Sequence, residues 1–243
     1  SKGMMGAAVL AAKACLRSGA GIVELHIPES GSQIIQSCVN EALCSCDSHM
    51  DMITEIKPDK ILKANAIAVG PGLGTQPDTV KALNALIKHS HQSLVFDADA
   101  INIIADNKTW LEFLPAYCIF TPHPKEFERL AGKTQNSFQR LNLQREFSNK
   151  YQCIIVLKGA HTSVSMPNGK VFFNSTGNPG MACGGSGDVL TGIITGLLAQ
   201  GYHPTEAAVI GVYLHGKAGD KALETHSSAS LIASDIIEAL CCI

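Results

Sequence analysis

Short apolar runs that favour β-strands alternate with helical patterns along most of this chain. Strands are expected at residues 22–27, 66–69, 94–96, 118–120 and 154–157, and helices at 7–16, 78–89, 125–131 and 139–149. Strands separated by helices form a mostly parallel sheet that carries helices on both faces. The fold class is therefore α/β, with the sheet as the middle layer of three.

The last third of the chain departs from this alternation. Two short β-prone runs, 162–166 and 170–173, flank Pro167-Asn168-Gly169, which predicts a hairpin at one edge of the sheet. Helices expected at 205–224 and 231–240 would cover the sheet. No repeat, low-complexity segment or linker interrupts the 243 residues, so a single domain over residues 1–243 is expected.

Charge and cysteine usage exclude several classes of protein. The net charge is −2 with dispersed lysines and arginines, so neither a nucleic acid nor a membrane is expected as a partner. No apolar run reaches the roughly 18 residues of a membrane span. The nine cysteines lack zinc-like pairing, and their odd number fits a reducing cytoplasm, so a cytoplasmic protein with small-molecule substrates is expected.

A glycine-rich loop runs into a helix between Asn174 and Gly201. Apolar residues recur at helical spacing from Val189, so the helix is expected to start near Gly187-Asp188. Gly184, Gly185 and Gly187 allow the main chain to approach a ligand, and a helix start offers free N–H groups to an anion. Asp188 would lie beside a bound phosphate, placed to take a proton from an attacking hydroxyl.

A purely structural interpretation of this segment stays open. Asp188 would then cap a buried helix, and Gly192 and Gly196 would allow close packing against a neighbouring helix. The segment matches neither the Walker pattern GxxxxGK[ST] nor a Rossmann GxGxxG at the first βα turn.

Four further polar motifs follow expected strands, where ligands bind in open α/β sheets. The loop GPGLG, residues 70–74, lets a ligand lie against the main chain or simply makes a turn. In DADAIN, residues 97–102, the two carboxylates are candidates to bind ligand hydroxyls or a hydrated magnesium ion. Alternatively, one carboxylate caps a helix and the other is a solvated acid.

The other two motifs follow the expected strands 118–120 and 154–157. In TPHPKEF, residues 121–127, two prolines hold His123 before a helix, as a ligand contact or a structural histidine. In KGAHT, residues 158–162, a cation and a glycine end a strand where a nucleotide would pack; the alternative is a simple bend between strands.

Taken in order, these motifs and the run GAAxLAAxAxLRSGAG, residues 6–21, resemble the NAD(P)H-hydrate dehydratase family over nearly the whole chain. The resemblance implies a ribokinase-like fold and the ADP- or ATP-dependent dehydration of hydrated NADH or NADPH. This is a metabolite-repair reaction that releases phosphate, together with AMP when ADP is used.

The resemblance also implies roles for particular residues. Asp188 would be the catalytic base that deprotonates the hydroxyl of the hydrated nicotinamide. Magnesium is expected with the nucleotide, without an indication of its protein ligands. TPHPKE matches the bacterial form of the motif, which implies ADP rather than ATP. Contacts to the hydrated cofactor are implied at Ala7, Gly72, Gly74, His123 and Asp188, and nucleotide contacts at Lys158, Gly159, Ala160, His161, Thr162, Gly184, Gly185 and Gly187.

The chain departs from the family pattern at its start. Family members begin this domain with a strand that ends in a GGS-like turn, whereas this chain opens at Ser1-Lys2-Gly3. The first strand is therefore expected to be missing, together with the N-terminal epimerase domain that some bacterial relatives carry. The intact protein is expected to supply that strand. The resemblance further implies a homo-oligomer, with a tetramer as the candidate state.

Two other functions stay open on the sequence. A small-molecule kinase of the same superfold, of the hydroxyethylthiazole or hydroxymethylpyrimidine type, would use the glycine loop and Asp188 equally well. A nucleotide sensor without turnover would keep KGAHT and the loop but should lack a base, so Asp188 argues against it.

Overall fold

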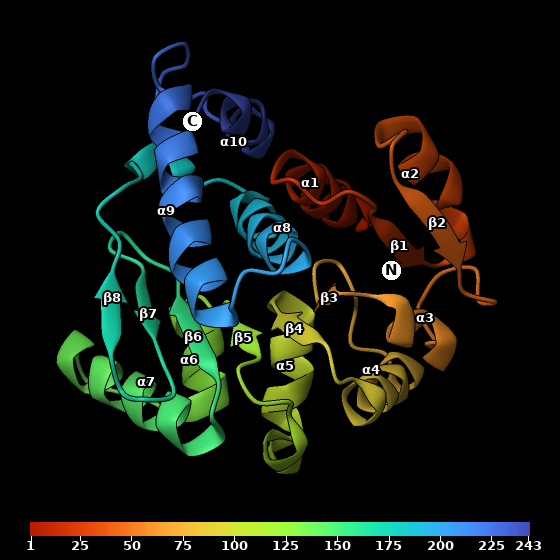
Figure 1. The fold of residues 1–243 in the computed structure, drawn as a ribbon, viewed down its shortest axis with the longest axis horizontal. Coiled ribbons are helices and arrows are strands. Elements are labelled where there is room, and N and C mark those ends of the chain that lie inside the picture. Colours follow the sequence, from red (N-terminus) through yellow and green to blue (C-terminus); the bar gives the residue numbers. More distant parts are fainter.

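The computed structural model describes the backbone of residues 1–243 and every side chain except that of Lys60. Its larger sheet has six strands in the order β3-β4-β5-β6-β7-β8 over the described residues (Figure 1). The β3–β6 neighbours pair in parallel, and β7 and β8 are antiparallel additions. The strands are β3 (Ala66–Val69), β4 (Ser93–Phe96), β5 (Ile119–Phe120), β6 (Ile154–Leu157), β7 (Ser163–Ser165) and β8 (Val171–Phe173).

Helices cover both faces of this sheet, because successive strand residues point to opposite sides. Val95 faces a core built with α1, α8, α9 and α10, whereas Leu94 and Phe96 face a core built with α4, α5, α6 and α7 (Figure 1). The three-layer α/β sandwich is thus confirmed. The helices are α1 (Met5–Arg17), α2 (Ser32–Cys38), α3 (Pro58–Lys63), α4 (Pro77–His89), α5 (Ala98–Asp106), α6 (Pro124–Ala131), α7 (Ser137–Tyr151), α8 (Ser186–Ala199), α9 (Pro204–Ala222) and α10 (Ala233–Ala239).

The expected strand at 22–27 forms only over Glu24–Ile27, and it does not join the larger sheet. This strand, β1, pairs in parallel with β2 (Leu43–Cys46), which the sequence did not predict. The pair packs with α2 around Met5, Ile27 and Ile35, a small core separate from the two main ones (Figure 1). The alternating pattern therefore identified a strand but not its partner.

Most other elements appear where the sequence predicts them. β3 and β6 match to the residue, and β7 and β8 form the expected hairpin at the sheet edge. The hairpin turn closes through the Met166 amide, which donates to the Lys170 carbonyl at 2.9 Å. α2, α3 and α5 were not predicted. Among the described helices, none is both long and apolar enough to cross a membrane.

Candidate active site

Three of the predicted motifs meet along the edge of the sheet that is formed by the carboxyl ends of the strands, because β4, β5 and β6 are parallel and end side by side. Backbone hydrogen bonds continue across this edge beyond the strands. The amide of Thr121 donates to the Phe96 carbonyl at 3.0 Å, and that of Lys158 to the Pro122 carbonyl at 2.9 Å. The residues that follow the strands are therefore held in register with one another.

The glycine-rich loop ends at the start of α8, one residue earlier than expected. Gly185 takes a φ of 89°, and a Cβ there would meet Leu10 Cδ1 at 2.4 Å. Gly184 has open space where a side chain would be. No side chain caps the helix, whose first residue is Ser186. Uncapped N–H groups and the positive end of the helix dipole make this start suited to an anion such as phosphate.

Asp188 lies in the first turn of α8 and is half-buried. The pKa of its carboxyl is raised to about 6, chiefly by burial and also by the negative charge of Asp97, while the positive charge of Lys158 lowers it. Within the described residues, no hydrogen bond or ion pair engages this carboxylate. A carboxylate with such a pKa can accept a proton from a reacting group near neutral pH.

Asp97, at the end of β4, is buried and forms an ion pair across the edge. Lys158 Nζ donates to its Oδ1 at 2.8 Å, and Thr191 Oγ1 of α8 donates to its Oδ2 at 2.8 Å. A Cβ on Gly187 would lie 3.2 Å from Lys158 Nζ. The ion pair therefore lies directly against the first turn of α8, beside Asp188.

The rest of KGAHT forms an exposed turn after β6. The Thr162 hydroxyl accepts from the Gly159 amide at 3.3 Å and lies 3.2 Å from the Gly159 carbonyl. Gly159, Ala160 and His161 are exposed. The simple bend between strands is thus present, and its exposed main chain is open to a ligand.

The GPGLG loop packs onto the start of α1. A Cβ on Gly72 would lie 2.5 Å from the Met4 carbonyl oxygen and 3.4 Å from the Ala7 Cβ, so the structure brings Gly72 and Ala7 together. The Gly74 amide donates to Asp99 Oδ2 at 2.8 Å. Asp99 thereby anchors this loop to α5.

His123 has a structural role in the fold, because it caps α6. Its Nδ1 accepts from the amides of Lys125 and Glu126 at 3.1 and 3.2 Å, and Glu126 Oε2 accepts from the His123 amide in return. Nδ1 therefore carries no proton. The ring remains about half exposed, with a side-chain exposure of 49%, and its Nε2 lies 3.4 Å from Glu126 Oε1.

Sequence reasoning missed a partly buried pair of side chains at the start of α8. His215 of α9 lies with Nε2 3.2 Å from the Ser186 hydroxyl. Burial lowers the pKa of His215 to about 4, so this ring is neutral at physiological pH. Thr191 was missed as well, because only the folded chain brings it to Asp97.

The carboxylates after β4 do not form a magnesium site. Asp97 is occupied by Lys158 and Thr191, and Asp99 by the Gly74 amide. Over the part of the chain that the structure describes, no group of three or more His, Cys, Asp or Glu residues could hold a metal ion. These residues fit only an ion that takes most of its ligands from nucleotide phosphates and water, as Mg²⁺ commonly does.

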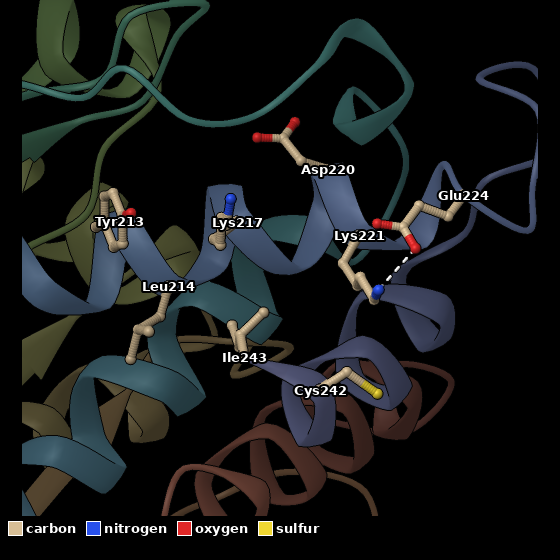
Figure 2. A pocket seen from close by; sticks show the side chains of 8 residues that line it. All are labelled: Tyr213, Leu214, Lys217, Asp220, Lys221, Glu224, Cys242 and Ile243. Carbon is tan, nitrogen blue, oxygen red and sulfur yellow. Dashed lines mark hydrogen bonds and ion pairs between the residues drawn. The ribbon is translucent and has the colours of Figure 1, made fainter.

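A separate hollow of about 480 Å³ lies between α9 and the C-terminal turn (Figure 2). Its wall includes Tyr213, Lys217 and Cys242, and an ion pair of 2.6 Å joins Lys221 to Glu224 at its rim. None of the predicted site residues lines it. We therefore place the candidate site at the carboxyl ends of β4, β5 and β6 and not in this hollow.

Known proteins of similar fold share this architecture. The structure of an NAD(P)H-hydrate dehydratase from Bacillus subtilis, co-crystallised with ATP and Mg²⁺ and soaked with CoA, superposes with a TM-score of 0.82 at 31% identity, over 99% of this chain and 86% of that one. Ribokinase from Arabidopsis thaliana, in complex with ribose and ATP, superposes with a TM-score of 0.61 at 11% identity, over 96% of this chain and 86% of that one. The latter likeness shows the ribokinase-like fold alone.

Sequence comparison gives closer relatives. The bifunctional NAD(P)H-hydrate repair enzyme Nnr of Moorella thermoacetica is 38% identical over 248 residues, which cover 99% of this chain and 47% of that protein. The chain thus spans about half the length of the bifunctional relatives it matches. The ADP-dependent (S)-NAD(P)H-hydrate dehydratase of Neisseria meningitidis is 37% identical over 246 residues, covering 98% of this chain and 80% of that protein. A family model described as NAD(P)H-hydrate dehydratase matches residues 1–241, and the chain belongs to that family.

Proposed function

We propose that this chain catalyses the nucleotide-dependent dehydration of hydrated NADH or NADPH, restoring the reduced cofactor. The observation that carries the proposal is a carboxylate of raised pKa, Asp188, in the first turn of a helix whose uncapped start suits phosphate. Membership of the dehydratase family supports the same activity.

Each step of the proposed reaction has a group at the site. Asp188 takes the proton of the substrate hydroxyl while the oxygen of that hydroxyl bonds to the terminal phosphorus of the nucleotide. If the nucleotide is ADP, AMP is the leaving group. Amides at the start of α8 and Lys158 stabilise the charge of the transferring phosphoryl group. The carbon–oxygen bond then breaks, and phosphate departs with its electrons. The nitrogen of the ring assists, and a ring proton passes to solvent as the double bond returns.

The remaining predicted contacts surround this centre. The exposed turn Gly159, Ala160, His161 and Thr162 would hold the AMP part, and Gly184, Gly185 and Gly187 the phosphates. Ala7, Gly72, Gly74 and the half-exposed ring of His123 would contact the hydrated cofactor. An exposed main-chain surface suits a large dinucleotide substrate. The small ring bound by a vitamin-precursor kinase would instead need an enclosed apolar pocket.

We propose ADP with Mg²⁺ as the co-substrate. The ADP-dependent relative from Neisseria meningitidis supports ADP, whereas the Bacillus subtilis relative is described as ADP/ATP-dependent. Magnesium would neutralise phosphate charge during transfer, and this chain's part would be to hold the phosphates at α8.

The test follows the appearance of reduced nicotinamide absorbance when ADP or ATP and Mg²⁺ are added to purified protein and hydrated NADH. A nucleotide-dependent rise with equal phosphate release is expected, and Asp188→Asn should abolish it while nucleotide still raises the melting temperature. A stable phosphorylated product in place of phosphate would identify a small-molecule kinase. Near-normal turnover by Asp188→Asn would remove Asp188 as the base.

We also propose that the intact protein places one more parallel strand between β1 and β3, and carries an epimerase domain. Within the described residues, β1 pairs only with β2, and β3 pairs within its sheet only with β4. The Ser1 nitrogen donates to the Gly72 carbonyl just beyond β3. The bifunctional name of the longer relatives supports the second domain. Slower amide exchange in β1 and β3 of a longer natural chain would support the strand; unchanged exchange would contradict it.

A further inference from the structure

We propose that Asp97 is a positioning residue for the reaction: it fixes Lys158 against the first turn of α8 and keeps Asp188 a strong base by placing a second negative charge beside it. The inference rests on the proposed function, in which Asp188 takes the proton. It assigns to Asp97 a role that involves neither a metal ion nor a direct contact with substrate.

Asp97 is buried, and both of its carboxylate oxygens already have partners within the protein. Its side chain is about 2% exposed, and each carboxylate oxygen already accepts a hydrogen bond, from Lys158 and from Thr191. A buried carboxylate without its cation would be strongly unfavourable, so the pair must stay together. The position of Asp97 is fixed in turn by its amide, which donates to the Val69 carbonyl at 3.1 Å.

This ion pair ties three elements to the catalytic turn. Asp97 directly follows β4, Lys158 directly follows β6, and Thr191 lies on α8 one turn beyond Asp188. A Cβ on Gly187 would approach Lys158 Nζ to 3.2 Å and Asp97 Oδ2 to 3.9 Å. Glycine at 187 therefore permits the two charges to lie against the helix start, where phosphate is expected.

Few other charges face Asp188 from the packed elements. On α9, His215 contacts Ser186 and is neutral at physiological pH, since burial lowers its pKa to about 4. The residues of α1 that approach the α8 glycines include Leu10, Ala11 and Ala14, which are uncharged. On α10, Asp235 accepts from the Ile232 amide at its own helix start.

The charge state of Asp188 therefore reflects burial and the Asp97–Lys158 pair. Asp97 raises the pKa of Asp188 and Lys158 lowers it, so removing one or the other must move the pKa in opposite directions. A general loss of packing would not give opposite shifts. This difference in sign separates an electrostatic role from a merely structural one.

The experiment titrates the carboxyl carbon of Asp188 by ¹³C NMR in the full chain, with the signal assigned by its loss in Asp188→Asn. In Asp97→Asn, which keeps the shape and removes the charge, the pKa of Asp188 should fall by about half a unit or more. In Lys158→Met, the first protonation of the carboxylate pair should move to higher pH. Thr191→Val retains both charges and should shift the titration less than either.

The outcomes are decisive without any turnover. An unchanged pKa in Asp97→Asn, or shifts of the same sign in Asp97→Asn and Lys158→Met, would overturn the proposal. If Asp97→Asn fails to fold, Asp97→Ser, which also removes the charge, takes its place, and an unchanged pKa of Asp188 in that variant would overturn the proposal. If the wild-type protein shows no dehydration but the opposite shifts appear, the proposed reaction is wrong and the electrostatic arrangement stands. In an active enzyme, the acid limb of kcat against pH should shift down in Asp97→Asn.

Discussion

Two buried aspartates, Asp47 in the loop after β2 and Asp97 after β4, are held in different ways. Asp47 accepts from groups within eight residues along the chain: the amides of His49, Thr54 and Glu55 and the Thr54 hydroxyl, at 2.7 to 3.0 Å. Asp97 instead accepts from two side chains, 61 and 94 positions away. The Asp47 carboxylate holds together the loop that contains it, whereas the Asp97 carboxylate connects residues that are far apart in the sequence.

The difference teaches what each charge contributes. Hydrogen bonds from the loop hold the pKa of Asp47 at about 2, although burial opposes them. Its carboxylate accepts hydrogen bonds from donors of its own loop, and His26 Nε2 lies 3.5 Å from its Oδ2. The charge of Asp97 is shared with Lys158 beside Asp188, so it acts on the chemistry. A carboxylate satisfied locally serves stability, whereas one satisfied at long range serves the site.

The largest expected effect separates the two aspartates by turnover. Asp97→Asn should lower kcat roughly 100-fold, because Lys158 loses its anchor and Asp188 becomes a weaker base. Asp47→Asn should leave kcat within about twofold, since no predicted site residue touches Asp47. Steady-state kinetics at a temperature where both variants are folded would measure this. Equal losses in the two variants would break the comparison.

Asp47 should affect the stability of the fold, although it should not affect kcat. Asp47→Asn places an amide nitrogen against backbone donors, so the free energy of unfolding should fall by about 2–3 kcal/mol in urea denaturation. Thr54→Val, the matched control, removes only one hydroxyl donor and should cost about 1 kcal/mol. If Thr54→Val costs as much as Asp47→Asn, the loop is not organised by the carboxylate.

The pH dependence of unfolding should sharpen the same point. The pKa of Asp47 is lowered from 3.8 to about 2 in the folded protein, so its stabilisation is complete above pH 3.8 and is lost as the pH falls towards 2. The loss should be about 1–2 kcal/mol, discounted for solvent screening. Asp47→Asn should lack this acid-sensitive component. Parallel stability curves for wild type and variant below pH 4 would contradict the assignment.

The smallest effect concerns Asp188, whose shift has the opposite sign. Its folded pKa of about 6 lies above the ordinary 3.8, so ionisation destabilises the folded state as the pH rises from 3.8 through 6. The free energy of unfolding of Asp188→Asn should therefore be about 1 kcal/mol higher than that of wild type at pH 8. The difference should disappear at pH 4. Thermal unfolding at the two pH values would measure it, and a variant less stable at pH 8 would contradict it.

The sequence predicts short, continuous apolar strands well. β3 and β6 are such runs, and they match to the residue. β2 was missed because Leu43–Cys46 contains serine and cysteines rather than β-branched residues. α5 was not predicted, although Ala100, Ile101 and Ile104 have the three- and four-residue spacing of one helix face.

Site residues were predictable only as separate motifs. Gly72 and Ala7 do meet, and the start of α8 lies within two residues of its prediction. The bonds from Lys158 and Thr191 to Asp97 could not be foreseen, because they depend on which strands pair and where α8 docks. The local contacts of Asp47 had a readable signal, since an aspartate commonly bonds the amide two residues on.

The packing of α1 on α8 implies an order of folding. Each strand of the larger sheet after β3 pairs with the strand just before it in the chain, so this sheet can grow as the chain lengthens. The α1–α8 contact, in contrast, joins the start of the chain to its last quarter, where a Cβ on Gly192 would lie 2.2 Å from the Ala11 carbonyl oxygen. During synthesis, α1 must therefore remain without this partner until most of the protein has emerged. The first turn of α8, which carries Asp188, therefore acquires its final surroundings only after most of the chain has been made.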